Sequence, residues 1–134
     1  MKKFIEWKKD YELGFKEIDS QHKKLVIFIN KAYAAFHKKN ESKMKDVFND
    51  LLEFSRVHFS TEEKYFDKFH CEGSEEHKEK HAELIEKLLG FRDNFDGENK
   101  KYEKFLLFIK EWFDEHCNKY DKKYVSCFKR NGLK

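Results

Sequence analysis

Hydrophobic residues recur along most of this chain at alternating spacings of four and three, which is the period of a helix that buries one face. Four stretches keep this period. Their inward positions are Ile18, His22, Leu25, Ile29, Ala32 and Phe36; Met44, Phe48, Leu51, Ser55, His58, Glu62, Tyr65 and Phe69; His77, His81, Leu84, Leu88, Phe91 and Phe95; and Tyr102, Phe105, Ile109, Trp112 and His116. The pattern predicts four amphipathic helices, at about 19–38, 42–70, 74–95 and 99–119.

The connections between these stretches are short and carry capping or turn residues. These are Asp19 as the first N-cap, Asn40 and Ser42 between the first two helices, Gly73 as the end of the second, Ser74 as the cap of the third, and the Asp96-Gly97 turn. Short connections make neighbouring helices antiparallel, so we expect an all-α, up-down-up-down four-helix bundle. The chain, residues 1–134, would form one domain with an irregular N-terminal arm at 1–17. A tail at 121–134 would form a short C-terminal helix or fray.

The composition favours long helices and argues against some classes of function. The chain has no proline and only 5 glycines, and its 15 phenylalanines can fill a core. Lysine and glutamate are interspersed and the net charge is only +3, which argues against nucleic-acid binding. No stretch resembles a signal peptide or a membrane span, and Cys71, Cys117 and Cys127 form no CxxC pair. We therefore expect a cytoplasmic protein with reduced thiols that does not contact membranes.

Histidines occupy inward positions in all four predicted helices. Five of the seven histidines do so, namely His22, His58, His77, His81 and His116. Because antiparallel helices alternate in direction, these five are expected at one end of the bundle, together with Glu62 and Asp121. The other two, His37 and His70, each follow an inward phenylalanine and should face solvent.

Two ordinary explanations compete with a metal site. The HKEKH pair, His77 and His81, could be two surface residues, but it continues into the apolar face of its helix. The five histidines could instead be hydrogen-bonded core residues, but such a cluster would leave many polar atoms unsatisfied. The set exceeds the four ligands of a structural zinc, whereas two ions bridged by two carboxylates would use it fully. Imidazole with carboxylate suits iron, with zinc and manganese as competitors.

The spacing of His116 and Asp121 predicts an irregular helix end. The two residues are five apart, so on an ideal α-helix their side chains diverge by roughly 140°. For both to reach one site, the fourth helix must loosen there, and a π-type turn would achieve this.

These motifs resemble those of the hemerythrin family, and of its bacterial single-domain members in particular. They cover nearly the whole chain: Trp7, Tyr11 and Gly14; Ile18-Asp19-Ser20-Gln21-His22; His58-Phe59 and Glu62-Glu63; the HKEKH run; and Trp112 with His116 and Asp121. The resemblance implies two non-haem iron ions, joined by an oxo or hydroxo bridge, that bind dioxygen reversibly. By motif position, the ligands would be His77, His81 and His116 for one iron, His22 and His58 for the other, and Glu62 and Asp121 as bridges. The second iron would then have an open position for oxygen.

The resemblance also implies an apolar oxygen pocket. By position it comprises Leu25, Phe59, Trp112, Phe113 and Cys117, although ordinary core packing would use the same residue types. Phe113 stands where hemerythrins often have leucine, and Cys117 stands where an aliphatic residue is usual. A thiol is smaller than isoleucine and leaves space, so we expect Cys117 to shorten the lifetime of the oxygenated protein by admitting water or by being oxidised.

The predicted function is therefore oxygen binding, for transport, storage or scavenging, without enzymatic activity. A di-iron redox enzyme, such as a peroxidase or nitric oxide reductase, is one alternative. It is disfavoured because ferritin-like enzymes use Glu-x-x-His pairs, which this sequence lacks. The other alternative is an oxygen-sensing module, which would normally accompany an effector domain that these 134 residues do not contain. The sequence indicates no protein partner.

Overall fold

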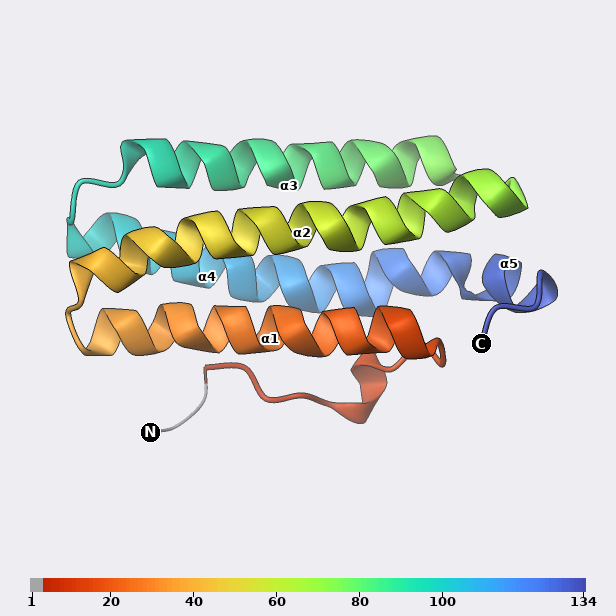
Figure 1. The fold of residues 1–134 in the computed structure, drawn as a ribbon, viewed down its shortest axis with the longest axis horizontal. Helices are drawn as coiled ribbons and strands as arrows, with labels where there is room; N and C mark the ends of the chain where they lie inside the picture. The colour runs from red at the N-terminus through yellow and green to blue at the C-terminus, as the bar shows by residue number, and fades with distance from the viewer. Residues whose placement is uncertain (1–3) are drawn as a thin grey trace.

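The computed structural model describes residues 4–134, and its four long helices form an antiparallel bundle (Figure 1). The helices are α1 (Lys16–His37), α2 (Glu41–Phe69), α3 (Ser74–Asn94) and α4 (Asn99–Glu115). The remaining elements are a 3-10 turn in the arm, η1 (Lys9–Tyr11), a π-helical turn, η2 (His116–Tyr120), a second 3-10 turn, η3 (Asp121–Tyr124), and the short helix α5 (Val125–Arg130). The predicted all-α, up-down-up-down bundle with an arm and a short C-terminal helix is confirmed. No helix within residues 4–134 is both long and apolar enough to cross a membrane.

The arm is fastened to the beginning of α1. This helix begins at Lys16, three residues before the predicted cap Asp19, so the prediction of that cap was wrong. The Asp19 carboxylate lies in the first turn and accepts hydrogen bonds from the backbone N–H groups of Leu13 (2.8 Å) and Gly14 (3.1 Å). Gly14 has a φ of 93°, a left-handed conformation that glycine adopts without steric cost.

The connection between α2 and α3 also differs from the prediction. His70, not Gly73, ends α2: it adopts a left-handed conformation with a φ of 52°. Gly73 instead precedes α3, and Ser74, the predicted cap, is the first residue of that helix. His70 is exposed and so is His37, as predicted for both.

One half of the bundle is filled by aromatic rings that pack edge-on or tilted against one another. Phe48, Tyr102 and Phe105 are buried and contact one another, with ring centroids 4.6–5.7 Å apart. The Tyr102 hydroxyl donates a hydrogen bond to the carbonyl of Ala32 at 2.9 Å, so its polar atom is satisfied. We call this half, built around Phe48, Tyr102 and Phe105, the aromatic end.

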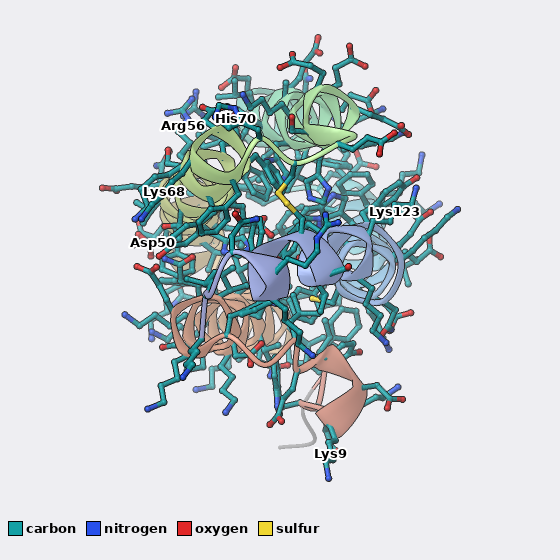
Figure 2. All side chains as sticks on the ribbon, turned by 90° about the vertical axis from the view of Figure 1, so that its right-hand side faces the viewer. Lys9, Asp50, Arg56, Lys68, His70 and Lys123 are labelled. Atoms are coloured by element: carbon teal, nitrogen blue, oxygen red, sulfur yellow. A yellow bond between two sulfur atoms is a disulfide. The ribbon has the colours of Figure 1, made fainter. Side chains whose placement is uncertain are left out.

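Two of the three cysteines form a disulfide, so the prediction of reduced thiols was wrong for these two. Cys71, just after α2, is bonded to Cys127 in α5 (Figure 2). Their sequence separation is 56 residues, and only the folded chain brings them within bonding distance. The bond holds α5 against the end of α2, where Phe66 and Phe128 belong to a second buried cluster. Cys117 is buried and free.

Candidate metal centre

Seven polar side chains meet at the end of the bundle opposite the aromatic end, and we call this the metal end. They are His22 from α1, His58 and Glu62 from α2, His77 and His81 from α3, His116 from η2 and Asp121 from η3. All seven are buried, with exposed fractions of 0–7%. Their ligand atoms form two overlapping groups, and within each group these atoms lie within 4.8 Å of one another. The structure thus brings together every residue that the sequence suggests as a metal ligand.

The chain after α4 changes its winding, as the spacing of His116 and Asp121 predicts. α4 ends at Glu115, and His116–Tyr120 form the π-helical turn η2. The wider turn brings residues five apart onto one face. Both His116 and Asp121 are consequently buried, with exposed fractions of 2% and 0%. The predicted π-type turn is confirmed.

Asp121 lies between histidines of different helices. Its Oδ1 is 3.0 Å from Nε2 of His77. Its Oδ2 is 3.0 Å from Nε2 of His22 and 2.9 Å from Nε2 of His116. One carboxylate therefore presents its two oxygens to three imidazoles, which is the arrangement that a bridging ligand requires.

Glu62 approaches the same histidine cluster from α2. Its Oε1 is 3.2 Å from Nε2 of both His58 and His81, and 3.5 Å from Nε2 of His116. Its Oε2 accepts a hydrogen bond from the hydroxyl group of Tyr124. Tyr124 is not among the site residues that the sequence suggests, and its only signal is its position one turn after Asp121. η3 therefore supplies the carboxylate of Asp121, and the Tyr124 hydroxyl in the same turn holds the carboxylate of Glu62.

Two histidines have hydrogen-bond partners on their outward nitrogens. Nδ1 of His58 lies 2.7 Å from Oε1 of Gln21, and Nδ1 of His81 lies 3.0 Å from Oε2 of Glu63. Because these oxygens accept, they fix a proton on each Nδ1 and leave the Nε2 lone pair directed inward. Gln21 and Glu63 each adjoin a candidate ligand in the sequence, but their role becomes visible only in the structure.

Several inward atoms of the cluster lack a well-formed hydrogen bond to any described residue. They are Nε2 of His81, Nε2 of His116, Oε1 of Glu62 and Oδ2 of Asp121. Buried polar atoms without partners lower the stability of a protein. Coordination of cations would satisfy all four atoms at once, so the residues present fit a metal centre.

The charges of the cluster also favour cations. Burial opposes ionisation of Glu62, but the histidines around its Oε1 hold its pKa well below the ordinary value. Burial lowers the pKa of His58 to about 4, so this imidazole is neutral, the form that binds metals. Burial also lowers the pKa of His116, but the carboxylates of Asp121 and Glu62 outweigh this effect and raise the pKa to about 10. A bound metal ion would displace the proton of His116.

Three of the residues suggested for the oxygen pocket lie deep in the bundle. Phe113 meets the ring of His22 edge-on, with centroids 6.1 Å apart. Sγ of Cys117 lies 3.6 Å from Nδ1 of His22, and burial raises the pKa of this thiol, which keeps it neutral. Leu25 belongs to the main hydrophobic core. Cys117 is thus a neighbour of a candidate ligand, a contact that its place beside His116 in the sequence does not reveal.

The other two pocket residues cover different histidines. Phe59 stacks on His81 with ring centroids 3.9 Å apart, and Trp112 stacks on His116 at 4.6 Å. A cleft of about 170 Å³ between α3 and α4 is lined by Trp112, His116 and Leu84 among others. The suggested pocket residues therefore contact histidines of both predicted ligand sets instead of one set alone.

Comparison with known proteins shows that this chain is similar to hemerythrins in sequence and in structure. The hemerythrin HHE cation binding domain matches residues 13–128. A bacteriohemerythrin of Clostridium acetobutylicum is 32% identical over 125 residues, covering 89% of this chain and 97% of that protein. A hemerythrin-like protein of Naegleria gruberi is 33% identical over 118 residues, covering 88% of each. A crystal structure of wild-type hemerythrin aligns with a TM-score of 0.79 at 22% identity, covering 92% of this chain and 97% of that one, which shows a common fold.

Proposed function

The chain belongs to the hemerythrin family, and we propose that its metal end holds two non-haem iron ions and binds dioxygen reversibly. The observation that carries this proposal is the cluster of seven buried ligands with its two overlapping groups of ligand atoms. Bacteriohemerythrin and hemerythrin are the names of the similar proteins, and oxygen binding is the function that goes with this family.

In the proposed centre, three histidines hold one ion, two hold the other, and both carboxylates bridge. The three sets are His77, His81 and His116; His22 and His58; and Glu62 and Asp121. The contacts of the carboxylates support the bridging role, because each lies within 3.5 Å of histidines from both sets. An oxo or hydroxo group would be the third bridge. The ion held by His22 and His58 would then have the open position for dioxygen.

The iron pair, when bound, supplies the electrons for reversible oxygen binding. The chain holds the ligands and keeps water away. Gln21 and Glu63 fix the protons and orientations of two imidazoles. Leu25, Phe113 and Cys117 are 0–1% exposed, so the side of the cluster near His22 is closed to solvent by two apolar side chains and a neutral thiol.

The test is iron analysis followed by anaerobic reduction and exposure to air. We expect two iron atoms per chain and a colourless reduced form that becomes coloured in air and bleaches again under vacuum. One iron per chain, or a colour that never reverses, would contradict the proposal. Continuous oxidation of an added reductant would instead show a di-iron redox enzyme.

A further inference from the structure

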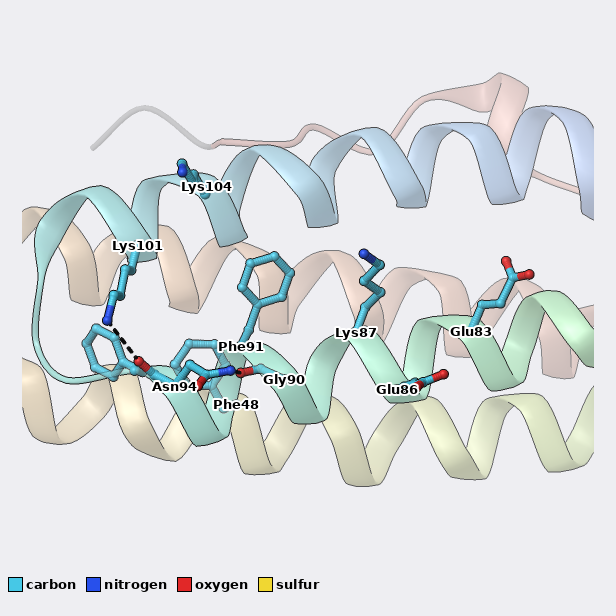
Figure 3. A pocket seen from close by; sticks show the side chains of 10 residues that line it. Phe48, Glu83, Glu86, Lys87, Gly90, Phe91, Asn94, Lys101 and Lys104 are labelled. Carbon is cyan, nitrogen blue, oxygen red and sulfur yellow. Dashed lines mark hydrogen bonds between the residues drawn. The ribbon is translucent and has the colours of Figure 1, made fainter.

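A groove lies between α3 and α4, centred at the aromatic end, and it meets the cleft beside His116 at Glu83 and Lys87 (Figure 3). Its volume is about 620 Å³, within the range of sites that bind small molecules. Phe48, Phe91 and Phe95 contribute aromatic surface to its wall. Phe91 and Phe95 are only partly buried, and Figure 3 shows the ring of Phe91 standing between the two helices. The groove therefore offers apolar surface that the chain itself leaves uncovered.

Gly90 in the wall of this groove has no explanation within the chain. It lies inside α3, where glycine is the least favourable residue apart from proline. Its φ is not among the positive values that would require glycine. A Cβ built at this position meets no atom within 4 Å, so no neighbouring group excludes a side chain. The space that Gly90 leaves free belongs to the groove, and a ligand that fills it would account for the glycine.

The charged groups around the groove leave two ammonium groups free. Lys101 is paired with Asp96 at 2.9 Å, and Glu83 is paired with Lys80 at 3.7 Å. Lys87 on α3 and Lys104 on α4 also line the groove, and they form no ion pair among residues 4–134.

One carboxylate of the lining, Glu86, is also without an ion pair in the described part of the chain. Figure 3 shows that its side chain runs along α3 away from Phe91, whereas Lys87 reaches toward α4. The aromatic part of the groove is therefore bordered by positive charge.

We propose that this groove binds a small amphipathic anion, independently of the metal centre. Its carboxylate or sulfonate group pairs with Lys87, Lys104 adds positive charge on the opposite wall, and its acyl chain or ring lies on Phe91 and Phe95. The apolar contact supplies most of the affinity, and the two exposed ammonium groups select the sign of the charge. The ligand is a free molecule and not a membrane lipid, because the apolar surface lies in a hollow between helices and not on a projecting face.

The first experiment is calorimetric titration of the iron-loaded protein with monomeric dodecanoate. We expect one saturable site per chain, binding at least about tenfold tighter than dodecanol or dodecyltrimethylammonium. Equal binding of the three amphiphiles would overturn the proposal. So would binding to phosphatidylglycerol vesicles without saturable binding of dodecanoate.

Substitutions in the wall locate the site. Gly90→Leu should fill the groove and abolish dodecanoate binding, while Ala82→Leu, at an exposed position of the same helix, should leave it unchanged. Gly90→Ala should raise the melting temperature by about 2–8 °C, because alanine is the better helix former. Undiminished dodecanoate binding by Gly90→Leu would refute the site.

A double variant tests the charge without changing the wall. Lys87→Gln with Lys104→Gln should weaken dodecanoate binding about tenfold and leave dodecanol binding unchanged. Iron content and the spectrum in air should be those of the wild type in every variant. If the double variant binds dodecanoate as the wild type does, the assignment of the anionic group is wrong.

Discussion

At the aromatic end, the inward faces of α2 and α4 present Phe48, Tyr102 and Phe105, and ring packing fills the bundle. At the metal end, the same two faces lead to His58, Glu62 and, through η2, His116. The hydrophobic period continues without interruption from one kind of residue to the other. The period therefore shows which positions are inside, but not what the inside is made of.

The two ends also differ in how their polar atoms are satisfied. The Tyr102 hydroxyl donates to a backbone carbonyl, so this buried polar atom at the aromatic end needs no partner from outside the chain. The metal end keeps inward atoms of Glu62 and His81 without a well-formed hydrogen bond. We infer that the aromatic end folds without metal, whereas the stability of the metal end depends on bound metal.

The largest expected effect comes from removing a bridging carboxylate. Asp121→Ala should lose iron, and its melting temperature should fall to that of metal-free wild type, because metal binding contributes to folding free energy. Iron analysis and thermal unfolding measure both changes. Glu115→Ala, at an exposed position one residue before the π turn, is the control. An Asp121→Ala protein that retains two irons would exclude a bridging role.

The second prediction concerns a substitution at the aromatic end. Phe105→Ala should cost about 3–5 kcal/mol of unfolding free energy in urea, because it opens a cavity in a packed core. Below its melting temperature it should still bind two irons. Leu107→Ala, where the side chain is 59% exposed, should change stability by less than about 0.5 kcal/mol. Loss of iron from folded Phe105→Ala would show that the ends are not independent.

Removal of the disulfide should have a smaller effect, at the metal end. The double variant Cys71→Ser and Cys127→Ser should lose about 2–4 kcal/mol, since the bond constrains the unfolded chain. Hydrogen exchange should accelerate in η3 and α5, near Asp121. Dithiothreitol should reproduce both changes in the wild type and do nothing to the variant. Unchanged exchange in these segments would argue against the bond as a support of the site.

The smallest effect is expected at Cys117. Cys117→Ile should slow the fading of the oxygenated spectrum by tenfold or less, equivalent to about 1.4 kcal/mol in the barrier. The substitution replaces an oxidisable thiol, 3.6 Å from Nδ1 of His22, with a larger apolar side chain. Cys117→Ala leaves more space and serves as the matched variant, which should fade faster if water entry is the cause. An unchanged rate in Cys117→Ile would mean that the thiol only fills space.

Features that depend on spacing could be predicted from the sequence. The positions of the five inward histidines follow from the helical period, and the π turn follows from the five-residue spacing of His116 and Asp121. The ends of helices were less predictable, because they depend on single backbone conformations. His70, for example, adopts a left-handed conformation that cannot be predicted from its residue type.

Features that depend on partners distant in sequence could not be predicted. The alternating period places Tyr65 inside, but the structure buries Phe66 and leaves Tyr65 partly exposed, with its hydroxyl donating to Glu17. Phe66 is inside because Phe128 of α5 packs on it, with ring centroids 5.6 Å apart. The contact of Tyr124 with Glu62 arises in the same way, from the folding back of the C-terminal segment.

The disulfide has a topological consequence for the chain. It closes residues 71–127 into a covalent ring that contains α3, α4 and four of the seven candidate ligands. A protease that cuts the turn at Asp96-Gly97, at the far end of the bundle, opens this ring but does not separate the two pieces. The nicked protein migrates as one band until it is reduced, and all seven candidate ligands stay on one covalent molecule.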